Sequence, residues 1–158
     1  MNEKNESMGP EAKIVVRDLD MGYGSFVLMS DMNFTVSKGD IFIIMGGSGC
    51  GKSTLLKVLI GLLEPLHGQV FYDGANFWEG DALQKDRIMR KIGVLYQSSA
   101  LWSSMTLAEN VALPLYYQGV TRRKRNLIAM EYLERVGLRD WWMHLPSELS
   151  GGQKQRIA

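Results

Sequence analysis

The pattern of hydrophobic and polar residues along the chain predicts an α/β fold. Residues 32–36 alternate between apolar and polar side chains, as a strand with one buried face does. Residues 41–45 form a continuous apolar run, which is typical of a strand buried on both faces. The other segments that predict strands are short: 14–17, 26–28, 69–72 and 92–96. Turns containing glycine are expected at 22–24 and at 73–74.

Helical patterns become dominant in the second half of the chain. The segments that predict helices are 52–61, 81–91, 106–113, 123–136 and a last one that begins at Gly151. Beyond Gln97 the β-branched runs disappear. Residues 98–147 are therefore expected to form a helical insertion on the α/β core.

One partial domain follows from this order of segments. The length suits a single compact core. Residues 1–10 are polar and are expected to form a flexible tail, and the domain is expected to span 11–158. Within it, residues 11–97 would form the β-subdomain and the core, 98–147 the helical subdomain, and 148–158 the start of the last helix.

Charge and cysteine content exclude several function classes. The formal net charge is +1, which gives no general attraction to nucleic acid, so no nucleic-acid partner is expected. Cys50 is the single cysteine and cannot form an internal disulfide, which favours a reducing cytoplasm. No apolar segment approaches the roughly 20 residues of a spanning helix. If the protein works at a membrane, other chains are expected to supply the spanning helices.

A glycine-rich loop between a predicted strand and a predicted helix is the first candidate binding site. Its residues 46–53 fit the pattern G-x-x-x-x-G-K-[ST], in which backbone N–H groups cradle phosphate oxygens. Lys52 would reach the β- and γ-phosphates of ATP, and the Ser53 hydroxyl would bind Mg²⁺. The residues expected to bind the ATP phosphates are Gly46, Gly47, Ser48, Gly49, Cys50, Gly51, Lys52, Ser53 and Thr54.

Alternatives remain open for the loop as a whole and for Cys50. A glycine-rich turn can contain a lysine by chance, although the strand–loop–helix context disfavours this. Cys50 either serves as a small side chain that fits the loop or is a reactive thiol at a helix N-terminus. We favour phosphate binding for the loop and a packing role for Cys50.

A second motif distinguishes among the families of proteins that contain such a phosphate-binding loop. Residues 149–153 read Leu149-Ser150-Gly151-Gly152-Gln153, and residues 154–158 follow as Lys-Gln-Arg-Ile-Ala. Here the chain resembles the ABC ATPases, whose signature sequence is LSGGQ. A Ser-Gly-Gly helix cap is the structural alternative, but it does not explain the full motif. The resemblance implies a P-loop NTPase core of the ABC type, with N-terminal antiparallel β strands and a helical insertion.

The resemblance also implies roles for other residues and for partners. Gln97 resembles the Q-loop glutamine, which is associated with Mg²⁺, with the attacking water and with the membrane partner. Tyr23 resembles the aromatic residue that stacks on adenine, although it could instead pack on the core as a strand-edge aromatic. In the family, Ser150 and Gly152 contact the γ-phosphate held by the opposite subunit, which implies a head-to-tail dimer. The expected partners are ATP, a second ATPase subunit and an integral-membrane permease, on the cytoplasmic face of the inner or plasma membrane.

One stretch resembles a particular subgroup. Residues 97–111 look like ATPases of Mla/Mce-type systems, which move phospholipids or other hydrophobic molecules. Gln153 departs from that subgroup, in which many members have methionine. Amino-acid importers and lipoprotein releasers share much of the same pattern.

Several family residues are expected to lie beyond Ala158. The signature helix of the family leads to the Walker B strand, which ends in Asp-Glu, and a histidine follows. The chain is therefore expected to be truncated before Walker B, to lack strands that would flank 41–45, and to be inactive alone. A soluble ABC-type ATPase of DNA repair or translation and an inert nucleotide-binding fragment are the alternatives.

Some residues invite a functional interpretation that the pattern does not require. The basic run at 122–125 is expected to be a solvated helix face, although anionic headgroups would also fit it. Trp141 and Trp142 are expected to pack within the helical insertion, with a permease-docking groove that includes Trp102 as the alternative. His67 and His144 are assigned no chemistry.

Overall fold

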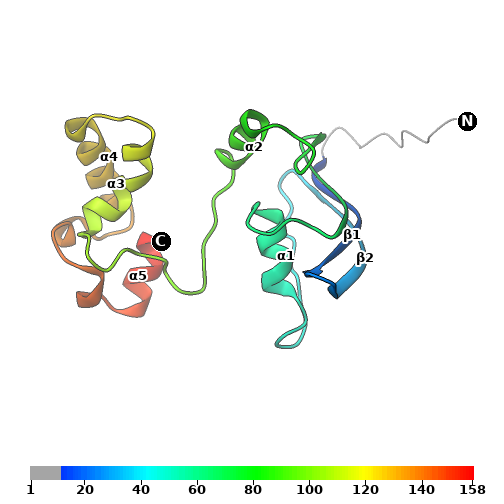
Figure 1. Ribbon diagram of the computed structural model, residues 1–158. Coiled ribbons are helices and arrows are strands. Elements are labelled where there is room, and N and C mark those ends of the chain that lie inside the picture. Colours follow the sequence, from blue (N-terminus) through cyan, green and yellow to red (C-terminus); the bar gives the residue numbers. More distant parts are fainter. Residues whose placement is uncertain (1–11) are drawn as a thin grey trace, which may run out of the picture. The chain divides into compact units, whose positions relative to one another are not determined.

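The computed structural model describes residues 12–158, and the tail expected at 1–10 lies outside the described residues. The chain divides into two compact units, with the boundary between Gly93 and Val94. The first contains a β-sheet and two helices, and the second contains helices (Figure 1). The chain thus has the α/β character that its sequence predicts, and its N-terminal strands are antiparallel, as the resemblance implies.

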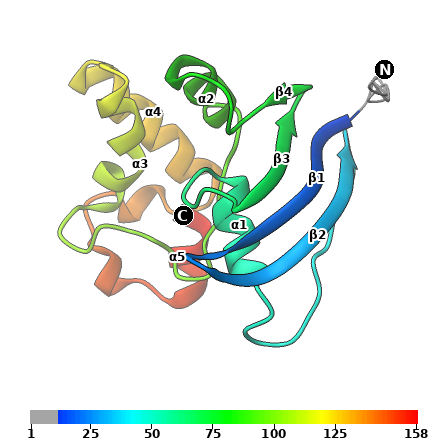
Figure 2. The same ribbon diagram turned by 45° about the vertical axis from the view of Figure 1, so that its right-hand side comes forward.

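The sheet of the first unit is antiparallel throughout, with the strand order β2-β1-β3-β4 (Figure 2). Its strands are β1 (Ala12–Tyr23), β2 (Phe26–Ser37), β3 (His67–Tyr72) and β4 (Ala75–Asn76). β1 and β2 form a long hairpin that turns at Gly24, which has a φ of 58°. The turn predicted at 22–24 is therefore shorter than expected, because Tyr23 belongs to β1 and pairs with Phe26.

A bulge explains why two predicted strands form one. The sequence predicts separate strands at 26–28 and 32–36, since polar residues lie between them. In the structure Asp31 adopts a φ of 53°, and its N–H donates to Oδ1 of Asp20 at 2.9 Å. The side chain of Asp20 thereby satisfies a backbone group at the irregularity, and β2 continues past it.

Two helices accompany this sheet, α1 (Lys52–Leu59) and α2 (Ala82–Met89). α1 buries Leu55 and Val58 in the core cluster of the sheet. The Tyr72 hydroxyl of β3 donates to the Leu59 carbonyl at 2.5 Å, which ties the sheet to the end of α1. Burial raises the pKa of Tyr72 to about 12, because the charged phenolate loses its hydration.

The prediction of a strand at 41–45 is wrong. The segment is irregular backbone, and Ile41 and Met45 are 90% and 84% exposed. Phe42 is partly covered, because it stacks on Phe34 at a centroid distance of 5.0 Å. A strand buried on both faces needs hydrogen-bonded neighbours, and within the described residues neither this segment nor 92–96 pairs with a strand.

The strand predicted at 92–96 is also wrong. The N–H of Ile92 donates to the Met89 carbonyl at 3.1 Å, so this residue completes the last turn of α2. Leu95 and Tyr96 are exposed on irregular backbone. The apolar pattern predicted a buried strand here, but strand pairing depends on distant segments that the pattern does not reveal.

The second unit is built around buried leucines. Its helices are α3 (Leu107–Tyr117), α4 (Arg122–Arg135), the 3₁₀ turns η1 (Arg139–Trp141) and η2 (Pro146–Glu148), and α5 (Gly151–Ile157). α3 extends beyond its predicted end at residue 113 and includes Pro114, since packing against α4 supports the helix where its sequence is unfavourable. The core cluster consists of Leu107, Leu133, Leu138 and Leu149.

Candidate functional site

The glycine-rich loop closes around the amine of its own lysine. Lys52 Nζ donates to the carbonyl oxygens of Gly46 and Gly47, at 2.7 and 2.6 Å, and lies 3.4 Å from Cys50 Sγ. The loop residues other than Gly51 and the half-buried Lys52 are exposed up to the start of α1. An ammonium group held by neutral carbonyls at an exposed loop is available to exchange them for anionic oxygens.

The N-terminus of α1 has no side-chain cap. Its N-cap residue is Gly51, which has no side chain to accept from the first-turn N–H groups, and the first turn contains no acidic residue. In contrast, the N-cap residues of α2, α3 and α5 are Asp81, Thr106 and Ser150, whose side chains accept such bonds. Uncapped N–H groups and the positive end of the helix dipole favour an anion.

Gly51 is favoured at this junction mainly by its backbone conformation. Its φ of 99° is a conformation that L side chains rarely adopt. A Cβ atom added here would also lie 2.9 Å from Met29 Sδ and 3.2 Å from Met21 Cε. The start of α1 therefore packs closely on the methionine side chains of β1 and β2.

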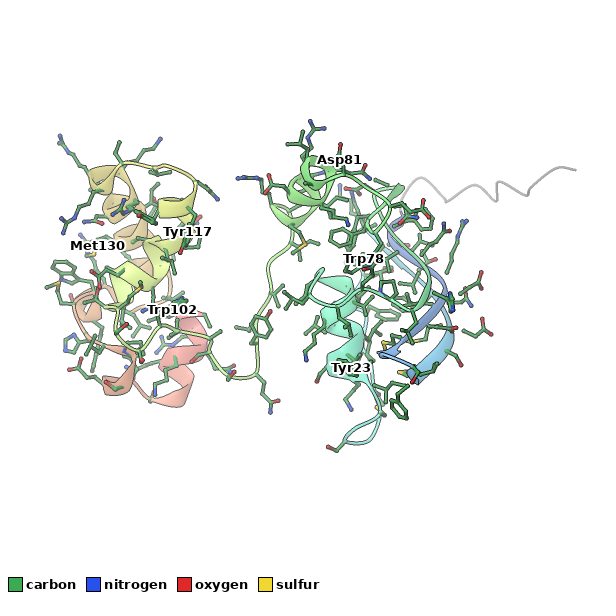
Figure 3. The ribbon with its side chains drawn as sticks, in the orientation of Figure 1. Tyr23, Trp78, Asp81, Trp102, Tyr117 and Met130 are labelled. Atoms are coloured by element: carbon green, nitrogen blue, oxygen red, sulfur yellow. The ribbon has the colours of Figure 1, made fainter. Side chains whose placement is uncertain are left out.

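Tyr23 lies beside the same helix, at the end of β1 (Figure 3). A hydrogen bond with the Thr54 side chain, together with the charge of Lys57, lowers the pKa of the Tyr23 phenol below its usual range. The residue is 50% exposed. The structure thus brings Tyr23 next to the phosphate loop, and its stacking on adenine stays a prediction.

The signature residues form the start of α5. Leu149 is buried in the leucine cluster, whereas Ser150, Gly151 and Gly152 are exposed. The N–H of Gln153 donates to Ser150 Oγ at 3.3 Å, and the N–H of Ser150 donates to Gln153 Oε1 at 2.8 Å. This reciprocal capping box explains why a serine and a glutamine occur at this spacing.

No steric need within this unit explains the signature glycines. A Cβ atom at Gly151 or Gly152 would meet nothing within 4 Å. Both residues lie in the first turn of α5, and glycine favours a helix less than alanine does. Small residues that the fold does not require are expected where another molecule approaches the backbone closely.

Gln97 belongs to the helical unit. It is exposed, and its backbone carbonyl accepts from Gln155 Nε2 at 3.0 Å. The predicted site residues thus fall into two groups, with the phosphate loop and Tyr23 in the first unit and Gln97 and the signature in the second.

Two residues of structural importance were missed by the sequence reasoning. Asn110 accepts from the Trp102 N–H at 2.8 Å and donates to the carbonyls of Met105 and Thr106 at 3.0 Å each, so it holds the segment that leads into α3. Lys57 adds its charge beside Tyr23. The spacing of Thr54 and Lys57, one helical turn apart, is the signal that would have indicated a shared face.

A capping box at the start of α3 accompanies Asn110. The Thr106 N–H donates to Glu109 Oε2 at 2.8 Å, and the Glu109 N–H donates to Thr106 Oγ1 at 3.3 Å. Hydrogen bonds from Thr106 hold the pKa of Glu109 below its usual range. The T-x-x-E spacing in the sequence is the pattern that predicts this cap.

The helical unit contains an open cavity of about 660 Å³. Trp102, which is 60% exposed, lines it together with Pro114 and Tyr132. Trp141 packs against the leucine cluster, as expected, whereas Trp142 is 42% exposed. Among residues 12–158 no group of three or more His, Cys, Asp and Glu side chains could hold a metal ion.

Comparison with known proteins identifies relatives over most of the chain. The family model described as ABC transporter matches residues 29–158. The chain is 42% identical over 134 residues to the methionine import ATP-binding protein MetN of Latilactobacillus sakei, covering 85% of this chain and 39% of the relative. It is 37% identical over 147 residues to the spermidine/putrescine import ATP-binding protein PotA of Nitrosomonas europaea, covering 93% of this chain and 39% of the relative. The chain therefore spans about two fifths of the length of these curated relatives.

The chain is also similar to solved structures of ABC transporter cassettes. The dimeric structure of MJ0796, described as a bacterial ABC transporter cassette, matches with a TM-score of 0.78 at 32% identity, covering 91% of this chain and 66% of that chain. A dimer of the same cassette bound to ADP and Pi matches with a TM-score of 0.76. Both structures exceed 30% sequence identity to this chain. In residues 12–158 no helix is both long enough and apolar enough to cross a bilayer.

Proposed function

Since the chain belongs to the ABC transporter family, we propose that it is part of the ATP-hydrolysing subunit of a transporter. The observation that carries the proposal is the geometry of the phosphate loop. Lys52 Nζ lies within the loop against the carbonyls of Gly46 and Gly47, at the uncapped start of α1. A flexible cation and free helical N–H groups at one place suit the phosphates of ATP.

We also propose roles for the other predicted site residues. Residues 46–54 would bind the phosphates, and Ser53, exposed in the first turn of α1, would offer its hydroxyl to Mg²⁺. The Mg²⁺ ion would neutralise charge on the phosphate oxygens. For Gln97, which belongs to the other unit, the proposed role rests on the resemblance to the Q-loop glutamine alone: it would contribute an oxygen to the ion and orient the attacking water. Tyr23 would stack on adenine, since its half-exposed ring lies beside Thr54.

The protection of Cys50 tests this assignment of the phosphate site. The thiol is exposed in the loop, 3.4 Å from Lys52 Nζ. We expect MgATP at about ten times its Kd to slow maleimide modification of Cys50 about tenfold, because only the free protein reacts. The rates would be measured by mass spectrometry with and without MgATP. A Lys52→Ala variant at the same ATP concentration is the control and should show little protection, and equal rates for the unaltered chain would contradict the proposal.

We further propose a head-to-tail dimer in which the signature acts on the partner's nucleotide. Ser150 is exposed at the start of α5, and the fold does not require glycine at Gly151 or Gly152. The similar cassette MJ0796 is described as dimeric and as bound to ADP and Pi. A backbone free of side chains would permit close approach of a γ-phosphate from the opposite subunit.

Mixed dimers test this arrangement. In a full-length protein with this sequence, a Ser150→Arg subunit paired with a Lys52→Ala subunit keeps one composite site intact and damages the other twice. We expect the purified heterodimer to hydrolyse more ATP than either mutant homodimer. Phosphate release by the three species gives the comparison. Heterodimer activity at or below that of both homodimers would count against a signature that acts across the dimer.

A permease is the second proposed partner, and it would place the protein on the cytoplasmic face of a membrane. The cavity beside the exposed Trp102 offers an aromatic surface for such a contact. The alternative, a soluble ABC-type ATPase, is less well supported because the relatives reported above are named as import proteins.

The transported substrate is a separate proposal. Residues 97–111 favour a lipid or another hydrophobic molecule, through their resemblance to Mla/Mce-type ATPases. The relatives named above are importers of methionine and of spermidine/putrescine, so they favour a small polar substrate instead. Stimulation of ATP hydrolysis by phospholipid, or by methionine or spermidine with a binding protein, in the assembled transporter would distinguish the two classes.

A further inference from the structure

The start of α4 violates the usual charge preference of a helix N-terminus. Arg122, Arg123, Lys124 and Arg125 follow the N-cap residue Thr121, which makes no side-chain capping bond, and the first turn contains no acidic residue. Cations at the positive end of a helix dipole are unfavourable. A local arrangement that costs stability is expected where a surface has another role.

The carboxylates of α4 are engaged elsewhere. Glu131 pairs with Arg135 at 2.6 Å, and Glu134 pairs with Arg139 at 2.9 Å. None of the salt bridges within residues 12–158 involves the basic residues at 122–125. Glu109 contributes only a minor electrostatic interaction with Arg122. The charge of this run is therefore largely uncompensated.

Exposed aromatic rings lie next to these cations. Arg125 sits over the ring of Tyr116, with Cζ 5.1 Å from the centroid, and Tyr116 contacts Tyr117 edge to face at 5.5 Å. Tyr116 and Tyr117 are 56% and 78% exposed. Figure 3 shows Tyr117 near the end of α3, close to the connection that leads to α4. We call Tyr116, Tyr117 and residues 122–125 the basic–aromatic patch.

We propose that the basic–aromatic patch binds the anionic headgroup surface of a membrane. Lysine and arginine side chains near an anionic bilayer contribute favourable energy individually, and tyrosine suits the boundary between headgroups and acyl chains. Exposed Leu127, one turn beyond Lys124 and Arg123, adds an apolar side chain. The nearness of a membrane rests on the proposed function, whereas the binding itself rests on this surface alone.

Charge favours a membrane over nucleic acid as the occupant. The chain has a net charge of +1 and an isoelectric point of about 7.8. Nucleic-acid-binding domains usually have isoelectric points above about 9, because many phosphates must be neutralised along the contact. A bilayer surface requires only a local cluster within a Debye length of the headgroups.

Vesicle binding tests the proposal. The purified chain would be sedimented with vesicles of phosphatidylcholine alone and with vesicles that also contain phosphatidylglycerol. We expect binding only to the anionic vesicles, and its loss when the salt concentration rises from about 0.1 M to about 1 M. Arg122→Gln/Arg123→Gln/Lys124→Gln should weaken binding by at least about tenfold. This variant is expected to stay folded, because it removes unfavourable charge from a helix N-terminus.

A matched variant removes the same charge elsewhere. Arg87→Gln/Arg90→Gln/Lys91→Gln deletes three exposed cations at the end of α2 and should bind anionic vesicles like the unaltered chain. Tyr117→Ser should weaken binding several-fold without a change in charge.

Three results with vesicles would overturn the proposal: equal losses of binding in the two triple variants, equal binding to neutral and anionic vesicles, or no binding to anionic vesicles. Tighter binding of a single-stranded RNA, lost in the same patch variant, would also overturn it and identify nucleic acid as the occupant. The assay contains no nucleotide, so its failure leaves the ATPase assignment untouched.

Discussion

Replacing Lys52 by alanine should weaken ATP binding by at least tenfold, which corresponds to about 1.4 kcal/mol. The Lys52 amine is held by the carbonyls of Gly46 and Gly47 at the start of α1. When ATP binds, this cation would exchange neutral carbonyl partners for phosphate oxygens, and charge-assisted hydrogen bonds are the stronger kind. Isothermal calorimetry with ATP and Mg²⁺ measures the change directly.

The control for this experiment is Lys38→Ala. Lys38 is an exposed lysine of the same unit, in the turn after β2, and its replacement removes the same charge. ATP affinity should then stay within about twofold of the unaltered chain, because exposed charges away from a ligand have small effects. Equal affinities for the Lys52→Ala variant and the unaltered chain would exclude the loop as the phosphate site.

Replacing Leu133 by alanine should lower the free energy of unfolding of the helical unit by about 2–5 kcal/mol. Leu133 is fully buried in α4, where it packs with Leu107, Leu138 and Leu149. Its truncation removes apolar contacts and leaves a cavity among these leucines. Urea unfolding followed by circular dichroism gives the change in midpoint. Since Leu149 begins the signature, we also expect the loss to loosen the position of Ser150.

Leu127→Ala provides the matched control on the same helix. Leu127 is 67% exposed, so the identical substitution removes little buried surface. Its effect on unfolding should stay within about 0.5 kcal/mol. Similar losses for the two variants would show that helix propensity, not the leucine cluster, determines the stability of this unit.

The sequence predicted those parts of the candidate site that are formed by residues close together in the chain. The spacing of Gly46, Gly51 and Lys52 specifies a loop that enters a helix, and the structure has α1 beginning at Lys52. Ser150 and Gln153 are three residues apart, as a capping box requires, and they form one. Both motifs depend on contacts between near neighbours, so the sequence contains them in full.

Tyr23 shows where local reasoning was incomplete. Its neighbours Gly22 and Gly24 predicted a turn, yet β1 continues through Tyr23 because Tyr23 pairs with Phe26. The position of Tyr23 beside Thr54 results from the packing of α1 on the sheet. That proximity joins residues of separate elements, and no spacing along the chain predicts it.

By itself, the sequence determined the helices, the phosphate loop and the signature cap, because their hydrogen bonds join residues a few positions apart. Only the tertiary structure decided which apolar segments pair. Residues 69–72 lie in β3 and pair with β1, whereas the more hydrophobic run at 41–45 pairs with no strand of residues 12–158 and is largely exposed. Hydrophobicity measures how much a segment gains from burial, but a strand also requires a second segment at hydrogen-bonding distance. That partner is a property of the folded chain.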